Sequence, residues 1–361
     1  MIARVALLTS ARAWRGSGTS FVNIARRLAA PDYDVALLTT SPPVTAGFAA
    51  CGLTAHELPI HDTGIREARL LARTLTRLGT DILLAEKPRD LRLGALVSMV
   101  HPIRLIYRYN VGAARPPADL ITRLAYRRTR MTIFLTQFAE AAARTHAPFM
   151  LRVPSRVIGE GVDLTRFHPD AGTGAAFRQR QGLGERRFLL AVGALEPEKR
   201  YDWLLHALTL MEQPPPLLIC GEGRLAGMIR ATASRDRLDI RLLGQLRPDE
   251  LASAYNAATC VVHAGAVETF GLSVAEAMAC GRAIVAVNGG AVSEVLGDAG
   301  VLTDPEDPRA FARAVGDLIG DPARRDVLGR RARDRAVARL SLDRMGREYA
   351  AAIATVAQGR A

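Results

Sequence analysis

The chain has 361 residues, 49% of them hydrophobic, and a formal net charge of +12 at pH 7. This length suits two domains with separate cores, and the hydrophobic content argues against intrinsic disorder. The apolar runs are shorter than the roughly 20 residues of a membrane-spanning helix, and the first one, RVALLT, is shorter than a signal-peptide core. We therefore expect a cytoplasmic protein whose excess charge favours anionic partners, such as nucleotide diphosphates or an acidic membrane surface.

Cysteines and lysines are both few. The cysteines stand at positions 51, 220, 260 and 280, without metal-ligand or redox-pair spacing, so we expect buried thiols and no metal site. Lys87 and Lys199 are the two lysines among 48 basic residues, which draws attention to both. The arginines are dispersed and no nucleic-acid-binding module is recognisable, so nucleic acid is not an expected partner.

The first half of the chain alternates short apolar runs with helical patterns. The runs are RVALLT, DVALLTT, DILLAE, RLIYRY, MTIFLT and RVIGEG. Strands separated by helices form parallel sheets with helices on both faces, and their ligands bind beyond the carboxyl ends of the strands. We predict a doubly wound α/β domain over residues 1–162.

A glycine-containing segment, Gly16 to Ser20, follows the first strand. A dinucleotide-binding fingerprint would require a third small residue where Phe21 stands and an acid at the end of the second strand, which DVALLTTSP lacks. This disfavours a dehydrogenase. A tight turn is one interpretation of Gly16 and Gly18.

A basic helix is predicted within ADLITRLAYRRTRMT. Leu120, Ile121, Leu124 and Ala125 fall on one face of it, so the helix could lie on an anionic membrane. The alternative is that this apolar face packs on the protein's own sheet while the arginines are solvated.

The second half begins near EGVDLTRFHPDAGTGAAF, where a strand ends at Glu160 and a polar segment follows. The strands predicted after it are RFLLAVG, PLLICG, IRLLG, CVVHAG and AIVAV. We therefore predict a second doubly wound α/β domain over 163–340 and a last helix at Ser341 to Ala354, within 341–361. A ligand cleft is expected between the two halves.

Lys199 lies where a helix opens near Pro197, after a strand that ends at Gly193. A cation in the first turn of a helix is unfavourable by about 0.3 to 1 kcal/mol unless an anion is present. Lys199 is therefore placed for a phosphate. The alternative is a solvated lysine paired with Glu196 or Glu198.

The most informative segment runs from Cys260 to Gly281 and predicts a strand, a loop and a helix at Ser273 to Ala279. A loop that enters a helix offers amides and a positive dipole end to a phosphate. Two acids beside it, Glu268 and Glu276, suit sugar hydroxyls. This predicts a nucleotide-sugar site. The alternative for Glu276 is a capping box with Ser273.

The spacing of the two acids in ETFGLSVAEAMACG, with GGAVSEVL after it, resembles the donor-site signature of glycosyltransferase family 4. The likeness covers most of the chain and is strongest from Val157 to Asp304. EGVDLTRF resembles the family's interdomain linker, with Glu160 in place of asparagine. The resemblance implies the two-domain GT-B fold, in which the last helix crosses back onto the first domain.

The resemblance also implies roles for individual residues. Glu268 would hold the transferred sugar and Lys199 the diphosphate, as the catalytic pair. Glu276 would bind the ribose, and main-chain groups would meet the donor. The remaining donor-binding candidates are Phe270, Gly271, Leu272, Gly16, Gly18, Gly221, Gly244 and Gln245. In the variable acceptor half, the candidate contacts to an anionic acceptor are Lys87, Arg89, Arg108 and Asn110, with ordinary surface charges as the alternative.

Two departures from the family pattern stand out. Ala194 replaces an arginine that would bind the diphosphate, and we expect Arg200, or else Arg12 or Arg15, to substitute for it. The histidine that many members carry in the first domain is absent, because the matching region reads IYRYNVG.

We predict a retaining glycosyltransferase that moves a sugar from a nucleoside diphosphate to a hydroxyl of a glycan, glycolipid or other small acceptor. The resemblance implies no metal ion and no cofactor beyond the donor, and the basic helix allows peripheral contact with the inner face of a membrane. A sugar-nucleotide epimerase and a non-catalytic sugar-nucleotide-binding subunit are the alternatives.

Overall fold

The computed structural model describes residues 3–14, 16–28, 33–110 and 119–359. The chain divides into two compact units. Unit 1 comprises Met1–Gly161 and Leu342–Ala361, and unit 2 comprises Val162–Ser341. Both breaks lie one residue from the domain limits expected from the sequence, 162/163 and 340/341.

Unit 1 contains a seven-stranded parallel sheet in the order β3-β2-β1-β4-β5-β6-β7. Strands of such a sheet are buried on both faces, which is why their sequences are nearly continuous apolar runs. The six predicted runs all form strands, whereas the three-residue β3 was not predicted. The strands are β1 (Ala3–Thr9), β2 (Tyr33–Thr39), β3 (Ala55–Glu57), β4 (Ile82–Ala85), β5 (Arg104–Tyr109), β6 (Thr129–Phe134) and β7 (Ser155–Val157).

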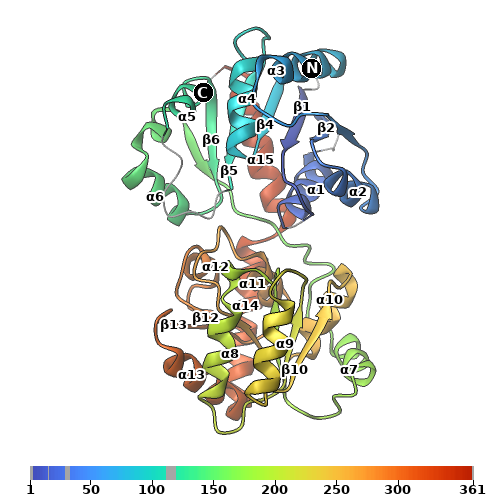
Figure 1. Cartoon of the computed structure of the whole chain (residues 1–361), viewed down its shortest axis with the longest axis vertical. Helices are drawn as coiled ribbons and strands as arrows, with labels where there is room; N and C mark the ends of the chain where they lie inside the picture. Colours follow the sequence, from blue (N-terminus) through green and yellow to red (C-terminus); the bar gives the residue numbers. More distant parts are fainter. Residues whose placement is uncertain (1–2, 15, 29–32, 111–118, 360–361) are drawn as a thin grey trace. The chain divides into compact units, whose positions relative to one another are not determined.

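Helices cover both faces of this sheet (Figure 1). One face packs against α1 and the returning α15 through a core that includes Phe21 and Ile353. The other face packs against α3 and α4 through Leu71 and Leu93. The helical segments are α1 (Gly16–Leu28), α2 (Pro42–Ala50), α3 (Ile65–Leu78), α4 (Pro88–Val97), α5 (Leu120–Tyr126), α6 (Gln137–His146), the 3-10 turn η1 (Pro148–Arg152) and α15 (Leu342–Ala357).

Unit 2 contains a six-stranded parallel sheet in the order β10-β9-β8-β11-β12-β13. All five predicted strands are present, and the short β13 was missed. The strands are β8 (Leu189–Val192), β9 (Leu217–Cys220), β10 (Ile240–Gly244), β11 (Cys260–His263), β12 (Ile284–Val287) and β13 (Val301–Thr303).

Helices also flank the sheet of unit 2, and α8 and α13 share a buried core with it that includes Leu205 and Phe311. The helical segments are α7 (Ala171–Arg180), the 3-10 turn η2 (Pro197–Lys199), α8 (Tyr201–Thr209), α9 (Ala226–Arg235), α10 (Pro248–Ala257), α11 (Leu272–Ala279), α12 (Val292–Leu296), α13 (Pro308–Gly320) and α14 (Pro322–Arg339).

The strand order reverses direction at one point in each sheet, between β1 and β4 in unit 1 and between β8 and β11 in unit 2. Ligands of open parallel sheets bind beyond the carboxyl ends of the strands at such points. The fold class predicted from the sequence, two doubly wound α/β domains, is confirmed. In the described part of the chain, no helix combines the length and apolar character required to span a bilayer.

Candidate active site

The switch point of the second sheet brings Lys199 and Glu268 together. Lys199 ends the turn η2, which follows β8, and Glu268 lies in the loop after β11. Lys199 Nζ donates a hydrogen bond to Glu268 Oε1, and the two side chains are 21% and 12% exposed. The alternative interpretation of Lys199, a solvated lysine paired with Glu196 or Glu198, is therefore wrong. The pair faces a partly open site at the edge of the sheet.

His263 joins this pair, although the sequence analysis did not single it out. It is the last residue of β11, its side chain is buried, and its Nε2 lies 3.3 Å from Glu268 Oε1. Burial alone would raise the pKa of Glu268, but the interactions with His263 and Lys199 lower it to about 2. Glu268 is therefore a carboxylate at neutral pH, and it can only accept hydrogen bonds.

The loop that carries Glu268 is fixed by the GGA turn after β12. A Cβ atom on Gly290 would lie 2.6 Å from the Glu268 main-chain nitrogen, and Gly290 has a φ of +57°. Ala291 N donates to Glu268 O at 3.1 Å. Only glycine at 290 permits this approach without strain, so the turn sets the position of the Glu268 backbone.

Helix α11 begins directly after this loop. Its first residue is Leu272, one residue before the start predicted from the sequence, and its N-cap is Gly271 with a φ of 91°. The first N–H groups of a helix have no partner within the helix, so Leu272 and Ser273 present donors at a positive dipole end. Phe270 is buried behind the turn. The segment that the sequence assigned to the diphosphate thus lies a few residues from Glu268.

Glu276 lies one turn into α11 and is partly buried. Tyr255 Oη donates to Glu276 Oε2 at 3.1 Å and also lies 2.9 Å from Ser273 O. Burial raises the pKa of Glu276 to about 7, against a smaller lowering by Tyr255. The capping-box alternative is wrong, because the helix starts before Ser273 and the N-cap is Gly271.

The glycines after β8, β9 and β10 pack main chain against main chain. A Cβ atom on Gly221 would lie 2.0 Å from Gly193 O, and Gly221 N donates to Gly244 O at 2.8 Å. Gln245 N lies within 3.4 Å of Glu222 Oε1. These contacts account for Gly221 and Gly244 structurally, and their predicted contact with the donor stays a prediction.

Arg200 does not extend freely into the site as a substitute for the missing arginine. Its Nη2 donates to Pro305 O at 3.0 Å and lies 3.6 Å from Glu306, while the guanidinium stacks 5.0 Å from the Trp203 ring centroid. Arg12 belongs to unit 1, and Arg15 lies outside the described residues. Among the described residues of unit 2, Lys199 is the cation that contacts Glu268, and a replacement of the missing arginine by Arg12 or Arg15 stays a prediction.

In unit 1, one of the four predicted acceptor contacts, Arg108, requires a correction. Its side chain is fully buried and pairs with Glu86 at 2.7 Å and with Glu160, while Nε donates to Tyr349 Oη at 2.8 Å. Burial favours the neutral guanidine, yet the carboxylates, with Glu160 foremost, raise the pKa of Arg108 above its ordinary value. Arg108 is a structural ion, because no face of it is open to an acceptor.

The other predicted acceptor contacts lie at the edge of the same network. Asn110 Nδ2 donates to Glu86 Oε1 at 2.8 Å, and Lys87 Nζ lies 3.8 Å from Glu86 Oε2 with its side chain 30% exposed. Arg89 is partly buried and donates to Thr40 Oγ1 at 2.6 Å. Of the four, Lys87 and Arg89 keep an exposed charge.

Gly16 and Gly18 are not in a loop, because α1 begins at Gly16. A Cβ atom on Gly18 would lie 2.8 Å from the Trp14 ring, and one on Gly47 would lie 2.0 Å from it. The ring also packs edge-on against Phe48. Gly18 therefore makes room for a tryptophan, and Gly16 has open space around it.

Three described cysteines, Cys220, Cys260 and Cys280, are buried, and Cys51 is partly exposed; all four are free thiols. Among the residues that the structure describes, no group of three or more histidine, cysteine or acidic side chains has the arrangement of a metal site.

Part of unit 2 resembles a known protein family. Residues 175–335 match the family model "Glycosyl transferases group 1". A D-inositol 3-phosphate glycosyltransferase of Salinispora tropica is 36% identical over 208 residues, which are 51% of this chain and 43% of that protein. A GDP-mannose-dependent alpha-(1-6)-phosphatidylinositol monomannoside mannosyltransferase of Mycolicibacterium smegmatis is 32% identical over 231 residues, 59% of this chain and 56% of that protein. The chain spans about half the length of these curated relatives.

Solved structures resemble the whole chain. Anabaena Alr3699/HepE, crystallised with UDP and glucose, has a TM-score of 0.86 and 18% identity over 97% of this chain and 99% of its own. Sucrose-phosphate synthase of Thermosynechococcus elongatus has a TM-score of 0.83 and 20% identity over 99% and 100%. With its two parallel-sheet α/β units, the chain has the GT-B fold.

Proposed function

We propose that this protein is a glycosyltransferase, because residues 175–335 match the family model of glycosyl transferases group 1 and the chain has the GT-B fold. Its donor would be a nucleoside diphosphate sugar bound by unit 2, and its acceptor a hydroxyl group of a glycan, a glycolipid or another small molecule. The observation that carries the proposal is the cluster of Lys199, Glu268 and His263 beside the amino end of α11.

The cluster supplies what binding of such a donor requires. The diphosphate is anionic, and it would be met by the Lys199 ammonium and by the amides of Gly271 and Leu272. Glu268, ionised because its pKa is about 2, would accept hydrogen bonds from the hydroxyls of the sugar. Glu276, one turn further along α11, would receive the ribose. In the absence of a donor, the Lys199 ammonium is paired with Glu268. When a donor binds, the ammonium would interact with both Glu268 and the phosphate.

The proposed reaction breaks the bond between the anomeric carbon and the donor phosphate oxygen. A bond forms from the same carbon to the acceptor oxygen, and the acceptor proton passes to the departing phosphate. We propose that the substitution occurs on one face of the sugar, with retention of configuration, and that it requires no metal ion. The charge on the leaving diphosphate would be stabilised by Lys199 and by the dipole of α11.

Donor binding can be tested by thermal unfolding with uridine, guanosine and adenosine diphosphate sugars. A ligand at 100 times its Kd should add about 2.7 kcal/mol of stability. The shift should be smaller in Lys199→Ala and preserved in Glu185→Gln, a control in which an exposed acid of unit 2 is changed. No shift with any of these donors would contradict the proposal.

The products separate this function from its alternatives. Transfer to an added acceptor, or slow hydrolysis of the donor, is expected of a glycosyltransferase. Conversion of the donor to an isomer without an acceptor would indicate an epimerase. Tight binding without transfer or hydrolysis would indicate a binding subunit.

We also propose peripheral contact between unit 1 and an anionic membrane. Leu120, Ile121 and Leu124 of α5 are 72%, 62% and 49% exposed, whereas Ala125 faces inward. The apolar face of this helix thus points away from the sheet, and exposed arginines lie close by at 127, 128 and 130. This combination suits lipid tails beneath acidic headgroups.

Co-sedimentation with vesicles tests this contact. Binding to phosphatidylglycerol-containing vesicles is expected, and it should fall in a variant with Leu120→Ser and Ile121→Ser. Equal binding by the variant, or equal binding to neutral phosphatidylcholine vesicles, would contradict the proposal.

A further inference from the structure

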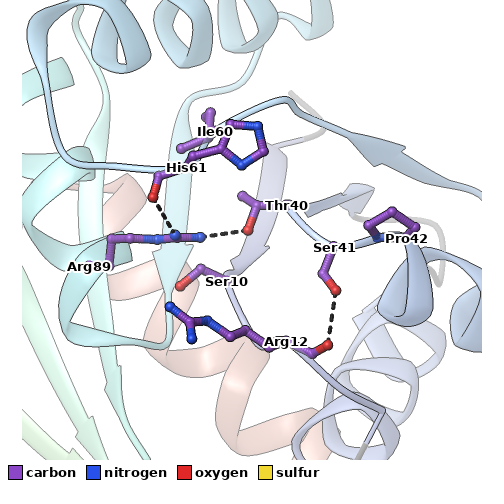
Figure 2. Close-up of a pocket in the computed structure, with 8 residues that line it drawn as sticks. All are labelled: Ser10, Arg12, Thr40, Ser41, Pro42, Ile60, His61 and Arg89. Carbon is purple, nitrogen blue, oxygen red and sulfur yellow. Dashed lines mark hydrogen bonds between the residues drawn. The ribbon is translucent and has the colours of Figure 1, made fainter.

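Unit 1 contains a pocket of about 400 Å³ at the carboxyl ends of β1 and β2 (Figure 2). Ligand pockets of small molecules typically start at about 300 Å³, so there is room for a compact molecule about the size of one sugar ring. Six of the eight residues that line it have polar side chains. The polar residues that line it are Ser10, Arg12, Thr40, Ser41, His61 and Arg89.

Arg89 reaches this pocket in a fixed orientation. It lies in the first turn of α4, and its guanidinium donates to Thr40 Oγ1 at 2.6 Å and to His61 O at 3.2 Å. Both partners are neutral, so they orient the guanidinium and leave its charge uncompensated. A planar guanidinium held in this way is suited to a phosphate or carboxylate oxygen pair.

Arg12 brings a second guanidinium from the opposite wall. Its carbonyl accepts a hydrogen bond from Ser41 Oγ at 3.2 Å, which fixes the backbone while the side chain stays exposed. Figure 2 shows the guanidinium groups of Arg12 and Arg89 on either side of the Ser10 hydroxyl. Among the residues that the structure describes, neither guanidinium has a carboxylate within ion-pair distance.

Three acidic groups near this edge of the sheet accept hydrogen bonds from other groups of the protein. Asp90 is buried and accepts from Ser10 N at 3.1 Å and from Lys87 N at 3.0 Å, and burial raises its pKa to about 6. Glu86 is held by Arg108, and Glu57 accepts from Thr45 Oγ1 at 2.7 Å. Within the described ranges, two arginines and no acid line the pocket, so its lining is positively charged.

The hydrogen-bond donors of the pocket differ from the backbone N–H groups of a typical nucleotide-binding site. Helix α2 starts beside it, but positions 42 and 43 are prolines and have no N–H groups, and Val44 N is bonded to Ser41 O. The available donors are thus guanidinium groups and hydroxyls on separate segments. A tetrahedral dianion presents several oxygens in different directions, whereas one guanidinium alone would satisfy a planar carboxylate.

We propose that this pocket binds a phosphate monoester carried by a small polyhydroxylated molecule or by a lipid headgroup. Arg12 and Arg89 would hold the phosphate from two sides, and the Thr40 hydroxyl, which accepts from Arg89, would donate to a remaining oxygen. Phosphate binding here depends on unit 1 alone. The identification of the phosphorylated molecule as the sugar acceptor rests on the proposed function.

Calorimetric titration of the full chain with inorganic phosphate, glycerol 3-phosphate and glycerol tests the site. Both phosphates should bind and glycerol should not. Arg12→Ala and Arg89→Gln should each weaken binding by about tenfold or more, since each removes charge-assisted hydrogen bonds. Arg69→Ala, which removes an exposed arginine of α3, is the matched control and should bind as the unchanged protein does.

Two further experiments distinguish a lipid headgroup from a free phosphate ester and this pocket from the proposed donor site. Phosphatidylcholine vesicles with and without phosphatidic acid test the lipid headgroup, and an Arg12-dependent preference for phosphatidic acid would identify that source. Lys199→Ala should still bind glycerol 3-phosphate, because the donor site lies in unit 2. Failure of nucleotide sugars to bind would refute the proposed function alone.

Two results would overturn the phosphate site. One is the absence of heat with any phosphorylated probe. The other is undiminished phosphate binding in both Arg12→Ala and Arg89→Gln. The Arg12 side chain is exposed, so Arg12→Ala should fold normally. If Arg89→Gln fails to fold, phosphate binding by Arg12→Ala decides the test.

Discussion

Each unit contains an ionic cluster at the carboxyl ends of its strands, but the central group is a cation in unit 1 and an acid in unit 2. In unit 1, the cation Arg108 lies between the acids Glu86 and Glu160, and none of their side chains is more than 8% exposed. In unit 2, the acid Glu268 lies between Lys199 and His263, and the lysine is 21% exposed. We infer from this comparison that the fully buried cluster holds the fold, and we expect the partly exposed one to exchange partners with a ligand.

Arg108→Ala should produce the largest effect, and it should act on stability. The substitution leaves two buried carboxylates without their cation, which typically costs about 3–5 kcal/mol. Urea unfolding of the variant should show this loss. Arg130→Ala, on an exposed position of the neighbouring strand β6, is the control and should change little. An unchanged unfolding midpoint for Arg108→Ala would show that the cluster of unit 1 does not stabilise the fold.

Glu268→Ala should act on turnover and leave the fold intact. Loss of a group that orients the reacting sugar should lower transfer by about a thousandfold or more, since single electrostatic groups contribute factors of this order. Product formation with the donor identified by the binding screen is the measurement. Glu268→Gln, which keeps the shape and loses the charge, shows how much of the effect is electrostatic. A variant that transfers sugar normally would contradict the assignment.

Lys199→Ala should lower transfer by about a hundredfold. It should also weaken the binding of nucleoside diphosphate, because the ammonium is expected to meet the leaving group. Arg200→Ala is the informative comparison, since its guanidinium is already held by Pro305 and Glu306 and should contribute much less. A greater loss with Arg200→Ala than with Lys199→Ala would reverse these roles.

The smallest predicted effect is a pH dependence that contrasts the two acids of the site. The pKa of Glu276 is raised to about 7, from an ordinary value of 4.5, so the stability associated with its protonated form is present below about 4.5 and lost as the pH rises through 7. The pKa of Glu268 is lowered to about 2, so its contribution is present above 4.5 and lost as the pH falls through 2.

Thermal unfolding between pH 4 and 8 can separate these contributions. Glu276→Gln should gain stability relative to the unchanged protein at the upper end of this range and lose the advantage at the lower end. A constant difference across the range would show that Glu276 has an ordinary pKa. Glu185→Gln serves as the exposed control here as well.

The sequence predicted most of the fold because the central strands of a parallel sheet are apolar on both faces. The three-residue strands β3 and β13 were missed, since neither is long enough for a pattern to develop. Glu268 and Lys199 were predicted from local spacing, and the structure brings them together. Local spacing carries this information when residues lie on loops whose positions are fixed by the strands before them.

Local spacing could not predict the roles of residues whose partners are distant in the sequence. Arg108 was interpreted as a surface contact, because nothing in RLIYRY indicates that acids at 86 and 160 converge on it. His263 was read as the end of a strand, although a polar residue that closes an apolar strand at a switch point is a usable signal. The direction of Arg200 depends on Pro305, more than 100 positions away.

The hydrogen bond between Arg108 and Tyr349 has a consequence for synthesis of the chain. Tyr349 belongs to α15, and this helix also fills the core of unit 1 with Met345, Ile353 and Val356. A fragment that stops at Gly161 would therefore expose an apolar face and lack the hydroxyl that meets its central guanidinium. On the ribosome, most of unit 1 is made before unit 2, but its helix α15 is made after unit 2, so unit 1 can be completed only after unit 2 has been translated.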